Sequence, residues 1–162
     1  MKRIFLLTAV VLCVTSAVNA AVRFQDSGLT VVTDTTVTFN IVSDDTAEYT
    51  HYVGNTPGLA ILTGMSINPT AGPDAFVTES PFGYYGYWEI TAQDDDPATW
   101  DIVSGVHFTG SLTVGSLTGI YSLELWNDDV LIIVDTLPIT IVPEPMTILF
   151  LGLGGLLLRR RK

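Results

Sequence analysis

The sequence predicts an all-β protein, an antiparallel β-sandwich with a signal helix at the N-terminus and a short transmembrane helix at the C-terminus. Three observations support the sandwich. Apolar and polar residues alternate with a period of two in many short runs, as in strands with one buried face. Clusters of turn-forming residues separate these runs. Residues 21–142 contain no capped stretch with the 3.6-residue apolar period of a helix.

The alternation is clearest in two runs. In residues 36–43, Val37, Phe39 and Ile41 share one face. In residues 119–126, Tyr121, Leu123 and Leu125 do the same. Further strands are expected at residues 29–33, 49–53, 59–63, 84–93, 106–114, 130–135 and 137–142, with turns at 43–45, 54–58, 68–73, 94–97 and 127–129. Short strands at this spacing are typical of a sandwich.

Residues 21–142 are expected to form one strongly acidic domain. Only Glu144 of the 17 acidic residues lies outside it and only Arg23 of the seven basic residues lies inside, which leaves a formal charge of −15. Nonspecific binding to nucleic acid depends on Lys and Arg near phosphates, and anionic lipid attracts the same side chains. The composition therefore excludes both as partners.

The N-terminus has the pattern of a cleavable secretory signal over residues 1–20. Lys2 and Arg3 precede an apolar stretch, and small residues lead to a cleavage site between Ala20 and Ala21. Signal peptidase and the general secretion machinery are thus expected partners of an exported protein. Cys13, the only cysteine, leaves with the signal, so the mature chain is expected to hold no disulfide and no thiolate metal site.

The C-terminus, residues 143–162, has three parts. They are a proline-rich triplet, an apolar run and a basic end: Pro143, Glu144 and Pro145, then residues 146–158, then Arg159, Arg160, Arg161 and Lys162. The apolar run is shorter than the ~20 residues of a permanent membrane span. The four cations are expected to stay cytoplasmic while the upstream domain lies outside. This predicts a short, temporary membrane anchor.

This order of parts, with Gly152, Gly154 and Gly155 in the apolar run, resembles the PEP-CTERM sorting signal. The resemblance implies that exosortase, an integral-membrane cysteine transpeptidase, cuts near the triplet and releases or transfers the domain. It also implies a Gram-negative bacterium that makes extracellular polysaccharide, which is a further candidate partner. The alternative is a plain C-terminal anchor that follows a proline-rich boundary.

A second resemblance concerns the domain itself. The runs at residues 106–110 and 119–126 resemble the closing strands of cohesin-like and immunoglobulin-like sandwiches. The resemblance implies a sandwich and assigns no functional residue.

Clustered carboxylates make one candidate calcium site: Asp94, Asp95, Asp96 and Asp101. The spacing lacks the Asp-x-Asp-x-Asp-Gly pattern of a helical calcium loop, and aspartate is common in turns. A solvated turn is the competing interpretation. The acidic pairs at 44–45 and 128–129 are weaker candidates of the same kind.

Aromatic residues are dense in residues 82–88. An exposed row of rings can stack on sugars, and the candidates for such a row are Tyr84, Tyr85, Tyr87, Trp88 and Trp100. Period-two alternation sends Tyr85 and Tyr87 to one face of a strand and Tyr84 and Trp88 to the other. At least half of these rings are therefore expected in the core.

No residue is assigned a catalytic role. Only His51 and His107 can act as bases near neutral pH, and neither lies in a Gly-x-Ser-x-Gly or His-x-x-x-His motif. Both are expected on the solvent face of strands. The sequence thus predicts an exported, noncatalytic protein of the cell envelope or extracellular matrix with a structural or adhesive role. The alternatives are a carbohydrate-binding module and, third, a secreted hydrolase.

Overall fold

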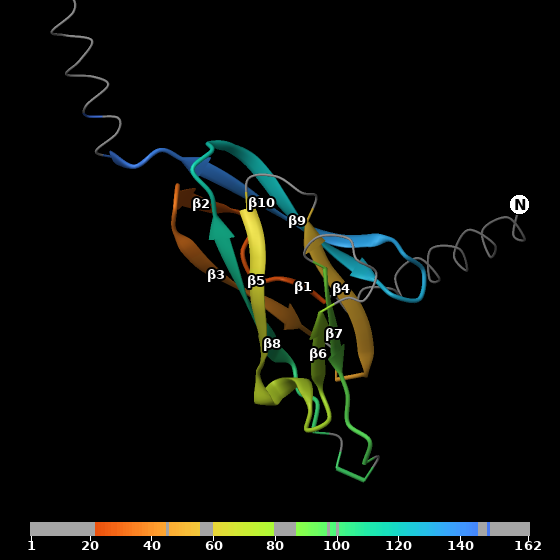
Figure 1. The fold of residues 1–162 in the computed structure, drawn as a ribbon. Helices are drawn as coiled ribbons and strands as arrows, with labels where there is room; N and C mark the ends of the chain where they lie inside the picture. The colour runs from red at the N-terminus through yellow and green to blue at the C-terminus, as the bar shows by residue number, and fades with distance from the viewer. Residues whose placement is uncertain are drawn as a thin grey trace, which may run out of the picture.

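The computed structural model describes residues 22–44, 46–55, 60–79, 87–96, 98, 99, 101–145 and 149. Within them the chain forms a two-layer β-sandwich (Figure 1). Its elements are β1 (Arg23–Phe24), β2 (Leu29–Val32), β3 (Thr36–Ser43), β4 (Tyr49–Asn55), β5 (Ala60–Ile67), the short 3-10 helix η1 (Pro69–Ala71), β6 (Phe76–Glu79), β7 (Trp88–Ala92), β8 (Gly105–Val114), β9 (Gly119–Asn127) and β10 (Ile133–Val142).

The strands divide into two sheets. The four-stranded sheet has the order β1-β3-β8-β5, and the six-stranded sheet has the order β2-β10-β9-β4-β7-β6. All pairs are antiparallel except β2 and β10, which run parallel with Leu29 beside Ile139. The prediction of a purely antiparallel sandwich is wrong at this pair. Alternation fixes which side chains are buried, whereas the direction of pairing depends on the path of the chain between strands.

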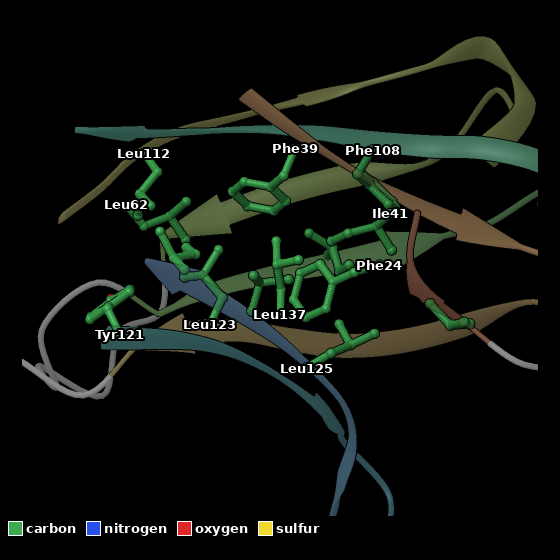
Figure 2. Close-up of a cluster of buried hydrophobic side chains, with 14 of the residues drawn as sticks. Phe24, Phe39, Ile41, Leu62, Phe108, Leu112, Tyr121, Leu123, Leu125 and Leu137 are labelled. Atoms are coloured by element: carbon green, nitrogen blue, oxygen red, sulfur yellow. The ribbon is translucent and has the colours of Figure 1, made fainter. Parts of the chain in front are cut away.

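The core lies between the sheets, and the predicted alternation holds in the two clearest runs. Phe39 and Ile41 of β3 are buried, and so are Tyr121, Leu123 and Leu125 of β9. Figure 2 shows these side chains meeting in the space between the sheets. Burying a side chain of this size contributes roughly 1.5–3 kcal/mol. The core is closed at one side by Phe24 of β1, whose ring meets Phe39 edge to face at 5.7 Å.

A glycine makes room for one of the core rings. A Cβ on Gly110 of β8 would lie 2.1 Å from Cζ of Phe39, well inside van der Waals contact. The Phe39 ring therefore packs directly over the β8 backbone, which a larger residue at position 110 would prevent.

The predicted strands differ from the observed ones at several places. The strand predicted at 59–63 continues to Ile67 as β5. The runs at 130–135 and 137–142 belong to one strand, β10, which has a bulge between Ile133 and Asp135. The sequence prediction missed β1, which has only two residues, and β6, whose four residues show no alternation of buried and exposed side chains. For the predicted strand at 84–93, β7 begins only at Trp88, and residues 80–86 lie outside the described residues.

The prediction that both histidines face solvent is wrong, since His51 is 5% exposed and His107 is fully buried. His51 lies on the same side of β4 as buried Val53. His107 is the extra residue of a β-bulge, because Ile41 pairs with Phe108 and the next residue, Val42, pairs with Val106. A bulge interrupts alternation, so His107 and Phe108 both point into the protein.

Candidate binding face

The outer face of the six-stranded sheet carries a row of four side chains across four strands. Tyr52 of β4 pairs with Trp126 of β9 on one side and with Glu89 of β7 on the other. Thr78 of β6 pairs with Glu89 and extends the row. The residues beside them in sequence point inward, including Val53, Ile90 and Leu125. We call Thr78, Glu89, Tyr52 and Trp126 the aromatic–acidic row.

Tyr87 adds a third aromatic ring beside this row. Its ring lies against the backbone of Gly54, where an added Cβ would be 2.0 Å from Cδ1 of Tyr87. Gly54 pairs with Glu124 of β9, whose carboxylate accepts a hydrogen bond from Nε1 of Trp126 at 3.1 Å. The glycine thus lets Tyr87 lie flat on the sheet, and Glu124 fixes the orientation of the indole.

The electrostatics of the face are anionic. The Tyr52 hydroxyl donates a hydrogen bond to Asp128, and this bond, partial burial and the charges of Asp128 and Glu89 raise the pKa of Tyr52 to about 12. Burial and the charge of Glu124 raise the pKa of Tyr87. Both phenols therefore stay neutral near pH 7. The face offers flat rings beside carboxylate acceptors, and these suit cationic side chains or the hydroxyls of a sugar.

The outer face of the four-stranded sheet differs in kind. Hydroxyl and amide side chains are frequent on it, beside the exposed Ile61, and several of them bond to one another. Thr113 contacts Thr36 at 3.3 Å and Thr63 at 3.4 Å, and Thr109 donates to Asn40 at 2.9 Å. None of these residues is charged, and their polar groups already have partners. The aromatic–acidic row differs in presenting aromatic rings beside carboxylates, so it is the candidate binding face.

The predicted aromatic candidates fall in three groups. Tyr87 lies on the binding face. Trp88 packs against the core, as alternation predicted for half of the rings. Tyr84, Tyr85 and Trp100 lie outside the described residues. Sequence reasoning missed both Tyr52 and Trp126 as site residues. The alternation in β4 and β9 marks both as outward, but their pairing depends on strand order.

The predicted carboxylate cluster is built around Asp94. Its side chain is 3% exposed and accepts hydrogen bonds from the backbone N–H groups of Asp101 at 2.6 Å and Asp96 at 2.9 Å. These bonds lower the pKa of Asp94. Asp95, Asp96 and Asp101 are exposed, and the described residues contain no group of three or more potential metal ligands. In this geometry Asp94 closes a loop, while calcium binding there stays a prediction.

The proline-rich triplet follows β10 directly. Pro143 is half-buried, whereas Glu144 and Pro145 are exposed. Residues 1–21, which include Lys2, Arg3, Ala20 and Ala21, lie outside the described residues, and so do 146–148 and 150–162 with the basic end. In the part of the chain that the structure describes, no helix has the length and apolarity needed to cross a membrane.

Comparisons with known proteins identify the fold. The chain matches no family model, and no curated protein is significantly similar to it in sequence. Among solved structures it is similar to CaCohA2 of Clostridium acetobutylicum, with 16% identity and a TM-score of 0.59 over 76% of this chain and 92% of that one. It is also similar to the seventh ScaB type I cohesin of Pseudobacteroides cellulosolvens, with 13% identity and a TM-score of 0.55 over 75% and 91%.

A third similar structure is the sixth cohesin of scaffoldin B from Acetivibrio cellulolyticus, solved in complex with a Cel5 dockerin. It has 8% identity and a TM-score of 0.55 over 75% of this chain and 97% of that one. At these identities the likeness defines the fold alone. The chain therefore has a cohesin-like β-sandwich, and the expected cohesin-like architecture is confirmed.

Proposed function

We propose that this chain is an exported, noncatalytic module that binds a protein partner through the aromatic–acidic row. The observation that carries the proposal is the alignment of Glu89, Tyr52 and Trp126 in one register across three strands of a cohesin-like sandwich. Aromatic side chains are enriched at protein interfaces, and carboxylates complement a cationic partner. Two of the similar structures are cohesins in complex with dockerins, which supports a protein as the partner.

The proposal is tested by the fraction of mature domain retained on the surface or matrix of the producing cells. Tyr52→Ala and Trp126→Ala are expected to reduce retention by tenfold or more, as for residues at the centre of an interface. Thr38→Ala and Thr113→Ala, on the opposite sheet, are the matched controls and should bind normally. Equal retention of all four variants would reject the face as the binding site.

A carbohydrate is the second candidate partner. Tyr52, Tyr87 and Trp126 share one face with Glu89 and Glu124, and this combination of rings and carboxylates also suits a sugar. Treating the matrix before the retention assay separates the two candidates. Loss of retention after proteinase treatment indicates a protein, whereas loss after periodate oxidation of glycans indicates a polysaccharide.

We propose that the two terminal segments direct export and sorting of the protein. Residues 1–20 are the secretory signal, residues 21–142 are the mature domain and residues 143–162 are an exosortase-dependent sorting signal. The exposed Glu144 and Pro145 after β10 support access by a protease. Changing Pro143, Glu144 and Pro145 to alanine should leave the protein exported, uncut and membrane-bound. Immunoblots of membrane and medium fractions, with and without exosortase, test this. Normal shortening and release of the variant would reject the sorting signal.

A further inference from the structure

The turn between β9 and β10 exposes five consecutive aliphatic side chains. We call residues 130–134 the hairpin tip, and its exposed fractions are 59% for Val130, 65% for Leu131, 55% for Ile132, 45% for Ile133 and 41% for Val134. Elsewhere in the described residues, no two exposed large apolar side chains are neighbours in sequence. A run of this length on a protein surface is unfavourable in water unless another molecule covers it.

The tip is held in place by the hydrogen bonds of Asn127. Its backbone N–H donates to the carbonyl of Ile132 at 3.0 Å, and its carbonyl accepts from the N–H of Leu131 at 3.0 Å. Its side-chain oxygen accepts from the N–H of Val130 at 3.1 Å. The adjacent Asp128 N–H donates to the carbonyl of Thr50 at 3.3 Å, which ties the turn to β4. The aliphatic side chains are therefore presented on an ordered turn.

Leu131 has a backbone conformation that its side chain disfavours. Its φ is 50°, in the left-handed region where glycine and asparagine are far better tolerated. Its side chain is the most exposed of the five, so burial within the domain does not offset this strain. Strain and exposure at one residue, beside the bulge of β10, are features found at binding sites.

The charges around the hairpin tip indicate what kind of molecule can bind it. Asp128, Asp129 and Asp135 flank it in sequence, and Arg23, the only basic residue of the domain, pairs with Asp44. Two copies meeting tip to tip would bring these carboxylates together, so a second copy is electrostatically disfavoured. An anionic membrane is disfavoured by the same charges. The chain leaves β10 at the end opposite the tip, about 30 Å away at roughly 3.3 Å per residue, so the tip is remote from the segment expected to enter the membrane (Figure 1).

We propose that the hairpin tip is the apolar anchor for a protein partner whose contact surface is aliphatic and bordered by Lys or Arg. The tip is continuous with the aromatic–acidic row, because Ile133 pairs with Trp126. The proposal rests on the proposed function in this one respect: the same partner covers the row and the tip. The aliphatic contacts hold the partner, and the flanking carboxylates select its cationic border.

Photo-crosslinking of the full chain in the cells that produce it tests this. A photoreactive amino acid is placed at position 130 in the tip, at 52 in the row and at 38 on the opposite sheet. The expected result is one shared protein adduct from 130 and 52 and none from 38, with the crosslinked peptide carrying aliphatic residues next to Lys or Arg. An adduct from 52 alone overturns the tip and leaves the proposed function intact, and no adduct from either site overturns both. From position 130, adducts of lipid, of a second copy, or of a peptide without those residues overturn the proposal.

A variant at the strained residue gives a second readout. Leu131→Asn keeps a residue that tolerates the left-handed conformation and removes the aliphatic side chain. The midpoint of thermal unfolding should stay unchanged or rise, while the adduct from position 52 falls about tenfold or more. Ile61→Asn, at a residue 64% exposed on the four-stranded sheet, is the control and should leave the adduct unchanged. Undiminished adduct from the Leu131→Asn protein would overturn the proposal.

Discussion

The hydroxyl of Tyr49 lies 2.8 Å from Nδ1 of His107, and the two rings stack at an interplanar angle of 8°. The other ring nitrogen, Nε2, lies 2.8 Å from the carbonyl oxygen of Val103, which can only accept. Nε2 of His107 therefore carries a proton, and in the neutral ring, which burial favours by lowering the pKa of His107, Tyr49 donates to Nδ1. This pair joins the two sheets through a polar contact inside the sandwich.

The buried histidines predict loss of stability in mild acid. Burial lowers the pKa of His51 and of His107 below the usual value of 6.5. The unfolded chain therefore binds protons near pH 6.5 that the folded chain refuses. The free energy of unfolding should have its full value above about pH 6.5. It should decrease as the pH is lowered further, by up to about 1.4 kcal/mol per pH unit for each such histidine.

Urea unfolding between pH 7.5 and 5.5 at constant ionic strength measures this slope. In His51→Asn the slope should be smaller than in the wild type, because one of the two buried histidines is removed. A free energy of unfolding that is constant over this range would contradict the neutral, buried state of both rings.

The hydrogen bond to His107 predicts a cost for Tyr49→Phe. The substitution keeps the stacked ring and leaves Nδ1 of a buried histidine without its donor, which should lower the free energy of unfolding by about 1–3 kcal/mol. Tyr52→Phe is the comparison, since its hydroxyl bonds to Asp128 at the surface and the loss of that bond should cost less, within about 1 kcal/mol. Equal effects of the two substitutions in urea unfolding would show that the buried bond is not a stabilising contact.

Two glycines predict opposite responses to alanine. A Cβ at Gly110 would collide with the Phe39 ring, so Gly110→Ala should destabilise the domain by about 1–3 kcal/mol. Gly64 of β5 has open space around the same position, and Gly64→Ala should be neutral or slightly stabilising. Thermal unfolding of both variants checks the close packing of Phe39 over β8. An unchanged melting temperature for Gly110→Ala would show that the Phe39 ring does not pack directly over Gly110.

The acidic composition predicts that the domain is stabilised by ionic strength in general and not by one specific ion. Added salt should weaken the repulsion among the carboxylates of the mature domain, and the melting temperature should therefore rise. Asp94 already accepts two backbone N–H groups, so calcium should act no differently from sodium at equal ionic strength. A much larger shift with millimolar calcium would instead indicate a specific site among the predicted carboxylates.

Much of the fold follows from local patterns. Thr36–Ser43 has the predicted bounds, and the buried faces of β3 and β9 are those that alternation predicts. The failures have non-local causes. The burial of His107 depends on a bulge opposite Ile41, and the parallel pairing of β2 depends on where the chain crosses between sheets. Neither is encoded in a period of two.

The binding face was less predictable than the fold. Tyr52 and Trp126 are 74 positions apart in the sequence and meet only because β4 pairs with β9. The dense run of rings at 82–88 predicts a site in one short segment. Of the described residues in that segment, only Tyr87 lies on the binding face. The hairpin tip has a visible sequence signal, the aliphatic run 130–134, but a buried strand would give the same signal.

The central claim, that a partner binds the six-stranded face, is tested most directly by blocking one face at a time. The mature chain is expected to hold no cysteine, so Thr78→Cys or Thr38→Cys should introduce a single thiol on one sheet or the other for coupling to a bulky polyethylene glycol. Retention of each labelled domain on the producing cells is then measured against its unlabelled form. The label at position 78 is expected to abolish retention of the domain on the cells, and the label at position 38 is expected to have no effect. Retention that survives the label at 78 and is lost with the label at 38 would contradict the central claim.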